Sequence, residues 1–488
     1  MDSLNLIVPV FFPILMGFIS YLIPWKSDKA RRIFCFAAIL LTTVFVWALI
    51  FTVSNKPLTL LRFTDYLSFR LRLDGAGKIF AALSSLLWPL TAVYAMDYMG
   101  HEKHRGMFWC FFTVSFGVTM GIAMSANLLT MYLFYEMLTL ATVPLVIHGM
   151  NRAAYHAGRK YMIYSFGGAA FAFITLSFLI YTGVYRGLPD FAMGGMSASY
   201  ASGTPDIMLI LFVCAFIGFG VKAAIFPFHG WLPTAGIAPT PVTALLHAVA
   251  VVKAGAFACI RLTYYTFGSD MLRGTWAQNF LLALSAFTIV YGSITALRQT
   301  HFKRRMAYST VANLSYILFA ILLMTENGLA ASFSHIIFHS FIKIVAFFAA
   351  GAVLHYANKQ YVDELEGIGR KMPVTFACFT VSALALTGVP PLNGFFSKWN
   401  ILSAAAENGT VFGYIGMAAL LISALLTAVY MFSVVVKAYF PRKNKELTGE
   451  VREAGKLMTV PMVIISLCSV AMGIFANQIY DIIVKAVL

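Results

Sequence analysis

The chain has 488 residues, of which 60% are apolar, 15% aromatic and only 11% charged. Because a soluble domain carries about a quarter charged residues, this composition excludes a soluble enzyme, a disordered scaffold and a nucleic-acid-binding protein. The 35 basic and 19 acidic residues give a net charge of +16. These charges lie mainly between apolar segments, which indicates the positive-inside bias of a multi-pass membrane protein.

The N-terminal segment is apolar from its start and has neither a basic lead-in nor a cleavage site of small residues. It is followed by the basic residues Lys26, Lys29, Arg31 and Arg32. We therefore expect a retained first span rather than a signal peptide. The basic residues after it predict that the N-terminus lies on the outer side of the membrane.

A helix needs about 20 apolar residues to cross the hydrocarbon core, and fourteen segments of this chain qualify. We expect spans at 5–25, 33–54, 78–96, 107–124, 126–148, 161–185, 207–227, 239–262, 278–298, 305–324, 328–356, 373–405 with a break, 411–438 and 457–484. Their even number places both termini on the outer side of the inner (cytoplasmic) membrane. The predicted fold is thus an all-α polytopic membrane protein.

The basic segments between these spans mostly follow the positive-inside rule. Those expected on the cytoplasmic side are 26–32, 152–160, 298–305 and 437–456. One basic segment, around Arg70 and Arg72, would lie outside. Its alternating pattern, Phe69-Arg70-Leu71-Arg72-Leu73, predicts a short hairpin rather than a further span.

Helix-breaking residues interrupt two of the apolar segments. They are Pro227, Gly230 and Pro233 in the seventh span, and Pro390, Pro391 and Gly394 in the twelfth. Five spans surround each break, at 107–262 and at 278–438, and because five is odd the second set would be inserted upside down. Such an inverted repeat, with helices 1–3 before it (1–106) and helix 14 after it (457–488), places broken helices on an ion path. A simpler possibility is that proline and glycine are frequent in membrane helices.

Five charged residues lie deep in the predicted spans: Glu136, Lys222, Lys253, Lys343 and Lys398. At ~3 kcal/mol for each charge at a helix centre, they would together cost on the order of 15 kcal/mol, more than a typical domain's net stability. This cost indicates a function or a compensating partner. Alternatives remain open, since Lys253 could extend towards water near Arg261 and irregular backbone could solvate Lys398. Glu136 and Lys222 could also form a purely structural pair.

Histidines extend this set of polar residues. His335, His339 and Lys343 recur every four residues, which places them on one helix face, and His247 lies six residues before Lys253. Neutral imidazole accepts a proton on one nitrogen and donates from the other, which suits a relay. The pattern is weak as a metal site, and a lone membrane histidine can simply bond a backbone carbonyl. The six cysteines form no C-x-x-C pair, so we predict no metal or cofactor site in this chain.

These residues lead to a mechanistic hypothesis. A carboxylate favours the charged form of a buried lysine, whereas desolvation opposes it, so Glu136 is expected to control the proton on Lys222. The expected route runs from Lys222 through Lys253 or His247, along His335, His339 and Lys343, to Lys398. Internal water must bridge the gaps that side chains cannot span.

Several motifs around these residues are similar to one membrane family. They are Phe134-Tyr135-Glu136, Lys222 with Pro227-Phe228-His229-Gly230-Trp231-Leu232-Pro233, Ala238 to Ala248, Lys303-Arg304-Arg305-Met306-Ala307-Tyr308-Ser309-Thr310, His335 to Lys343, and Gly388-Val389-Pro390-Pro391-Leu392-Asn393-Gly394-Phe395. Over about 107–440 the chain resembles the antiporter-like membrane subunits of respiratory complex I, of membrane-bound energy-converting hydrogenases and of Mrp-type Na+/H+ antiporters.

This resemblance implies two inverted five-helix repeats, broken helices 7 and 12, and a proton route along a central hydrophilic axis. It also implies a role for each matching residue: a pair of Glu136 and Lys222, a link through His247 and Lys253, an eleventh-helix element at Lys343 and a terminal residue at Lys398. Thr234 and Gly236 stand where many members have Asp and His. Proton uptake through that loop is therefore not predicted.

The leading prediction is a proton-translocating, non-redox subunit of a complex I-like enzyme or an energy-converting hydrogenase, with any Fe-S cluster, Ni-Fe centre or flavin in partner subunits. A subunit of an Mrp-type antiporter is the alternative. A stand-alone secondary transporter is less favoured, because the charges are strung along the chain rather than gathered round one pocket. Expected partners are further antiporter-like subunits, a peripheral redox arm, lipid and protons. The sequence leaves open which complex the chain joins and whether Na+ is moved.

Overall fold

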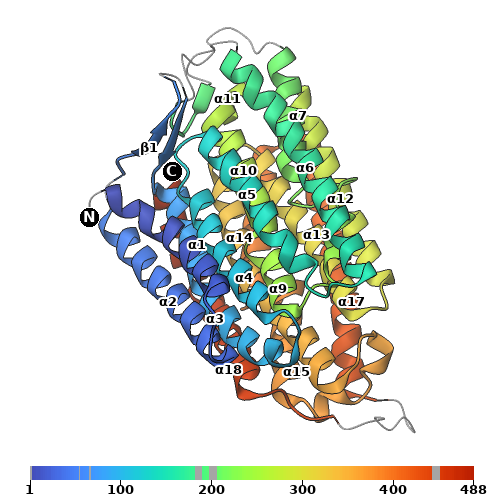
Figure 1. Ribbon diagram of the computed structural model, residues 1–488. Coiled ribbons are helices and arrows are strands. Elements are labelled where there is room, and N and C mark those ends of the chain that lie inside the picture. Colours follow the sequence, from blue (N-terminus) through green and yellow to red (C-terminus); the bar gives the residue numbers. More distant parts are fainter. Residues whose placement is uncertain (1–2, 54, 65–66, 182–188, 197–205, 442–450) are drawn as a thin grey trace.

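A computed structural model describes residues 3–53, 55–64, 67–181, 189–196, 206–441 and 451–488 (Figure 1). Long helices run along one bundle, with a small β-hairpin at one end near both termini. The helices are α1 (Ile7–Leu22), α2 (Asp28–Thr52), α3 (Gly75–Tyr98), α4 (Arg105–Ala123), α5 (Leu128–Val146), α6 (Arg152–Tyr181), α7 (Asp206–Gly220), α8 (Trp231–Ala235), α9 (Thr240–Ala248), α10 (Val251–Ile260), α11 (Ser269–Leu272), α12 (Trp276–Arg298), α13 (Phe302–Leu322), α14 (Glu326–Ala357), α15 (Pro373–Thr387), α16 (Asn393–Asn408), α17 (Val411–Tyr439), α18 (Lys456–Ile474) and α19 (Ala476–Val487). A π-helical segment, Arg261–Phe267, follows α10.

Twelve helical segments of the described residues are long and apolar enough to cross a membrane. Two shorter apolar helices, α7 and α15, lie where the first parts of the two broken spans are expected. The all-α membrane fold is therefore confirmed. The inverted relation of the two five-helix sets and the division at 106, 262 and 438 stay predictions.

The centre of the bundle consists of three nearly fully buried segments, Thr240–Phe267, α13 and α14. Helices that are apolar all round are typical of a core position, whereas α1, α2 and α17 expose many large apolar side chains, as lipid-facing helices do. The segments that carry His247, Lys253 and Lys343 are thus the ones most completely surrounded by protein.

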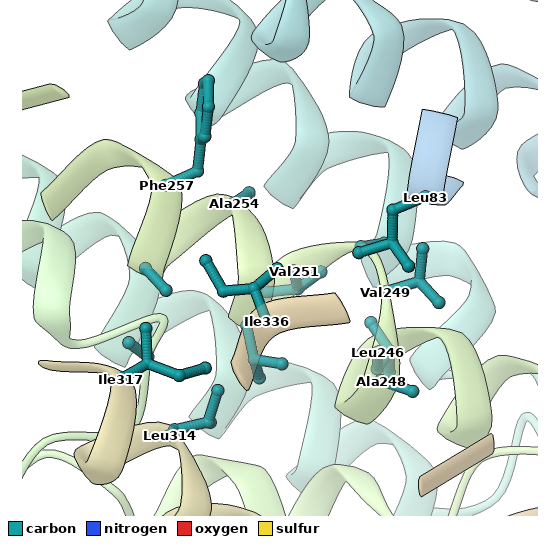
Figure 2. Packing of buried hydrophobic residues seen from close by; sticks show 14 of the residues in the cluster. Leu83, Leu246, Ala248, Val249, Val251, Ala254, Phe257, Leu314, Ile317 and Ile336 are labelled. Carbon is teal, nitrogen blue, oxygen red and sulfur yellow. The ribbon is translucent and has the colours of Figure 1, made fainter. Parts of the chain in front are cut away.

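Figure 2 shows apolar side chains packed around the junction of α9 and α10. We call this packing the apolar collar, made up of Leu246, Ala248, Val249 and Val251 near the junction, Leu314 and Ile317 of α13, and Ile336 of α14. Every one of these side chains is at most 1% exposed. The collar therefore encloses the middle of the bundle in tightly packed hydrocarbon.

The predicted hairpin is confirmed. Strand β1 (Leu58–Arg62) pairs antiparallel with β2 (Ser68–Leu71). A guanidinium nitrogen of Arg70 lies 2.9 Å from the Asp190 carboxylate, and one of Arg72 lies 3.6 Å from the Asp74 carboxylate. Because carboxylates neutralise these arginines, the hairpin can depart from the positive-inside pattern.

Two predicted segments differ from the structure. The segment 152–160, expected as a loop, is the start of α6, because the Asn151 side chain accepts a hydrogen bond from the Ala154 N–H (2.8 Å) and caps the helix. The span expected at 457–484 is two helices, since α18 ends at Ile474 and α19 begins after Phe475. The polar residues of α19 make it amphipathic, which suits a place at the membrane surface rather than across it.

Candidate functional site

Lys222 lies two residues beyond α7, in an irregular segment at 221–230. Its ammonium nitrogen is 3.6 Å from a carboxylate oxygen of Glu136 on α5 and 3.3 Å from the centroid of the Tyr135 ring. It also donates a hydrogen bond to the Tyr135 carbonyl. The Lys222 side chain is fully buried, whereas 18% of the Glu136 side chain is exposed. The structure thus brings together the two residues that the sequence pairs.

The break that frees Lys222 begins earlier than expected. Helix α7 ends at Gly220, so the predicted continuation to residue 227 is wrong. Pro227 and Gly230 lie within the irregular segment, and Pro233 lies in the short α8. The Trp231 indole donates a hydrogen bond to the Val221 carbonyl (2.8 Å), which satisfies a group left free by the end of the helix.

Gly255 allows α10 to approach this segment. A Cβ atom at residue 255 would lie 2.6 Å from the Ala223 nitrogen and 3.0 Å from the Lys222 carbonyl carbon. Both neighbours are backbone atoms, which cannot rotate away. The close approach therefore fixes the position of Lys222 relative to the helix that carries Lys253.

Gly255→Ala is expected to push α10 away from Lys222 and to destabilise the protein by about 1–3 kcal/mol, the usual effect of overpacking. The measurement is the thermal unfolding midpoint of the purified protein in detergent. Gly167→Ala is the matched control, because Gly167 is also helical and nothing lies within 4 Å of its Cβ position. Equal midpoints for the two variants would contradict the close packing of α10 on the Lys222 segment.

Four side chains form a continuous series of contacts, which we call the Lys–His line. The Lys253 ammonium on α10 is 2.7 Å from His339 Nδ1 on α14, and the rings of His339 and His335 stack with centroids 5.5 Å apart. His335 Nδ1 is 2.9 Å from the Ser397 hydroxyl on α16. All four residues are at most 2% exposed, so Lys253 does not extend to water near Arg261, which is itself fully buried.

Lys398 follows the line on α16. Its ammonium donates hydrogen bonds to the carbonyls of Leu386 (2.6 Å) and Thr387 (3.0 Å) at the end of α15. The last carbonyls of a helix have no helical partner and carry partial negative charge. The broken backbone therefore holds the charge of Lys398, which is the alternative that the sequence left open for this residue.

The second break has the expected position. Pro390 and Pro391 lie between α15 and α16, and Gly394 lies in the first turn of α16. A Cβ atom at residue 394 would lie 1.8 Å from the Ala385 carbonyl oxygen. Glycine therefore permits the contact between the two half-helices that brings Lys398 to the end of α15.

Lys343 and His247 lie beside the Lys–His line. The Lys343 ammonium donates a hydrogen bond to the Met306 carbonyl on α13 (3.2 Å). The His247 ring packs on the Phe347 ring, with centroids 4.6 Å apart. The face of α14 thus divides its contacts among different neighbours, and the expected single file through Lys343 is not formed by direct contacts.

The eighth span, expected as one helix at 239–262, is broken at 249–250 into α9 and α10. His247 and Lys253 consequently lie on opposite sides of this break. No proline or glycine marks it, so the sequence offered no signal. The two residues that the sequence linked as alternatives are therefore on separate rigid elements.

A second buried ion pair was not predicted. Asp74, at the start of α3, accepts two hydrogen bonds from the Arg261 guanidinium, at 2.6 and 2.7 Å. The guanidinium lies 4.7–4.9 Å from the ring centroids of Phe191, Phe257 and Tyr265. The two charged residues are 187 positions apart, so no local spacing could reveal the pair.

Hydroxyl groups join α12, α13 and α17 beside the line, and no sequence pattern predicted them. The hydrogen-bonded pairs are Ser309–Tyr430 (2.7 Å), Thr427–Tyr430 (3.0 Å), Tyr316–Ser423 (2.7 Å) and Ser293–Ser423 (2.5 Å). The Tyr316 ring centroid lies 5.5 Å from both the Lys398 ammonium and the His335 ring. The network therefore reaches the end of the Lys–His line.

The groups assembled here are ammonium, imidazole, carboxylate and hydroxyl, all of which bind and release protons. In the part of the chain that the structure describes, no three His, Cys, Asp or Glu side chains are grouped closely enough to hold a metal ion. The chemistry that the geometry supports is proton transfer between neighbouring side chains.

Comparison with known proteins identifies the family. The family described as NADH:quinone oxidoreductase/Mrp antiporter, transmembrane, matches residues 125–473, more than half of the chain. The chain belongs to this family. All eight charged and histidine residues predicted to carry protons lie within the matched range, whereas Asp74 lies before it.

Three relatives illustrate the spread of this antiporter family. Subunit N of the NADH-quinone oxidoreductase of Desulforudis audaxviator is 30% identical over 408 residues, covering 80% of this chain and 79% of the relative. Subunit L of that enzyme from Mycobacterium tuberculosis is 30% identical over 414 residues (83% and 63%). The Na(+)/H(+) antiporter subunit A1 of Staphylococcus aureus is 28% identical over 449 residues (86% and 54%).

Two solved structures share the fold. One is a chain of the membrane-bound sulfane sulfur reductase, an archaeal respiratory membrane complex, with a TM-score of 0.87 at 21% identity over 99% of this chain and 97% of that one. The other is a chain of the Mrp complex from Dietzia sp., with a TM-score of 0.85 at 20% identity and the same coverage. The family resemblance in the motifs is thus confirmed, and the antiporter-like fold covers the whole chain.

Proposed function

We propose that this protein moves protons through a membrane as an antiporter-like subunit of a multisubunit complex. The observation that carries the proposal is the direct contact of Lys253 with His339, followed by the stacked His335 ring. A lysine and two imidazoles in contact inside an apolar core have little structural value, because apolar residues of the same size would cost less there. A proton relay gives them a use.

Glu136 and Lys222 form the control point of the proposed relay. Two opposite charges about 4 Å apart attract each other by on the order of 4 kcal/mol at an effective dielectric of about 20. Neutralising or moving Glu136 removes that stabilisation from the Lys222 ammonium and favours release of its proton. The exposed fraction of Glu136 makes it the member of the pair that responds to its surroundings.

Transfer along the line follows from its hydrogen bonds. The Lys253 ammonium can donate a proton to His339 Nδ1, since a neutral imidazole accepts on one nitrogen and donates from the other. The Nε2 atoms of His335 and His339 are buried and make no hydrogen bond with the described residues. An internal water molecule between such atoms would complete the connection. The proton then reaches Ser397 and the Lys398 ammonium.

The proposal extends to the setting of the chain. The relatives are subunits of NADH-quinone oxidoreductases and of a Na(+)/H(+) antiporter. We place this chain among other membrane subunits in the inner membrane, with both termini outside and two inverted five-helix repeats, driven by redox chemistry in partner subunits. An Mrp-type antiporter subunit is the second candidate, favoured by the fold shared with an Mrp complex.

Lys222→Ala in the intact complex tests the relay. It is expected to lower proton translocation by on the order of 100-fold, because the chain loses a group that carries the proton. Glu136→Gln should also lower the rate, and the double variant should be no slower than the slower single one, since both act at one step. Rates are measured in native membrane vesicles. Lys78→Gln, which removes a lysine of α3 outside the line, is the control, and native rates for Lys222→Ala would refute the route.

Co-purification distinguishes the two settings. The protein is extracted from its native membrane in mild detergent, the accompanying subunits are identified, and iron and nickel are measured on the same sample. Iron-sulfur subunits in fixed stoichiometry are expected for a redox-driven complex, and nickel would indicate a hydrogenase. Small membrane subunits with neither metal would favour the Mrp-type antiporter, and sodium-dependent proton exchange would then be measured.

A further inference from the structure

A basic cavity lies away from the Lys–His line. Its volume is about 690 Å3, within the range of small-molecule sites, and it opens where α6 and α13 begin and α14 has ended. Its lining includes three permanent cations and two histidines: Arg152, Lys303, Arg304, His156 and His301. No aspartate or glutamate belongs to the described lining.

Lys303 is the residue that most needs a counter-charge. It is only 7% exposed, its ammonium donates a long hydrogen bond (3.4 Å) to the Ala238 carbonyl, and among the described residues no carboxylate lies within 4 Å of it. Burying a charge without a partner is unfavourable. The carboxylates that act on the cavity from a distance, Glu102 on Lys303 and Glu364 on His301, lie outside the lining. The cavity is therefore suited to an anion.

The rim of the cavity is apolar. Ile237 and Tyr361 belong to its lining and are 49% and 48% exposed. These side chains lie at the end of the membrane-spanning helices, at the level where lipid headgroups meet the acyl chains. Cations inside and apolar side chains at the rim are the arrangement that an amphiphilic anion requires, whereas a free inorganic anion would gain nothing from the rim.

We propose that this cavity binds the phosphate of an anionic phospholipid. The phosphate would lie among Arg152, Lys303 and Arg304, and the acyl chains would extend past Ile237 into the bilayer. Basic pockets between membrane helices attract acidic headgroups through such charge-assisted hydrogen bonds. The inference does not depend on proton translocation, since none of these residues belongs to the Lys–His line.

The test is photolabelling of the detergent-solubilised complex by phosphatidylglycerol with a photoreactive group close to its headgroup. Labelled peptides are mapped by mass spectrometry, and phosphatidylcholine with the same group measures background. Labelling at 231–240 and 357–362 is expected for phosphatidylglycerol. It should fall by roughly 30-fold in Lys303→Gln/Arg304→Gln and by roughly fivefold in Arg152→Gln.

Control variants distinguish a lipid site in the cavity from general attraction to basic loops. Arg370→Gln/Lys371→Gln removes two exposed cations from a neighbouring loop and should leave labelling unchanged. If the Lys303 variant does not assemble, Arg152→Gln decides the matter, because that side chain is exposed and lies outside the core. Equal labelling of the wild type and the cavity variants would overturn the proposal. So would loss of labelling in excess inorganic phosphate, which would indicate a free-anion site, or a cross-link to an acidic partner peptide in place of the lipid.

Discussion

Lys253→Gln is expected to lower proton translocation by on the order of 100-fold while leaving the protein folded. Glutamine is close to lysine in length, and its amide can still hydrogen-bond His339 Nδ1, but it cannot carry a proton. The change also removes a fully buried positive charge, so the unfolding midpoint should be unchanged or higher. Translocation is measured as acidification of vesicles that contain the intact complex, relative to the activity that drives it.

Two comparisons make this result specific. Lys343→Gln removes a lysine that is equally buried but bonds a backbone carbonyl outside the line, and we expect a smaller loss than for Lys253→Gln. Lys78→Gln should have no effect. If Lys253→Gln translocates protons at the native rate, the contact between Lys253 and His339 is not on the route, and the proposed function loses its main support.

Asp74→Asn is expected to destabilise the protein by about 3–5 kcal/mol, the usual effect of breaking a buried ion pair. The Arg261 guanidinium cannot lose its charge and would be left buried among aromatic rings with no carboxylate. Arg261→Gln should be milder, because Asp74 is partly exposed and keeps Arg72 at 3.6 Å. The measurement is the unfolding midpoint in detergent.

The double variant Asp74→Asn/Arg261→Gln should recover part of the stability lost in Asp74→Asn, since no uncompensated charge remains. Asp190→Asn is the matched control. It breaks the more exposed pair with Arg70, which is expected to contribute about 0–1 kcal/mol. Similar midpoints for Asp190→Asn and Asp74→Asn would show that the buried pair does not hold α3 to the segment after α10.

Residues with no local alternative were predictable from the sequence. Glu136 is an acidic residue deep in an apolar span, and Lys222 stands near helix-breaking residues, so their pairing follows from the high cost of isolated charges in a membrane. Proline and glycine likewise indicated both broken spans, although α7 ends before its proline because the Trp231 indole satisfies the backbone earlier.

Residues whose role depends on a neighbouring helix were not predictable. His339 and Lys343 have the same spacing on α14, but only the rotation of α10 and α13 against it decides that one contacts Lys253 and the other a carbonyl. The break between α9 and α10 has no proline or glycine, because packing rather than local preference produces it. The Asp74–Arg261 pair joins distant parts of the chain and needs the fold to exist.

The apolar collar has an electrical consequence. A membrane that stores an ion gradient loses it if any protein offers a permanent conducting wire, and a file of protonatable groups is such a wire unless it is interrupted. The collar fills the junction between His247 and Lys253 with hydrocarbon, which acts as an insulator between the two ends. Current can cross this gap only while the hydrocarbon is displaced or wetted. The collar rather than the charged side chains therefore limits the leak, and it protects the gradient from short circuit whenever the driving reaction is idle.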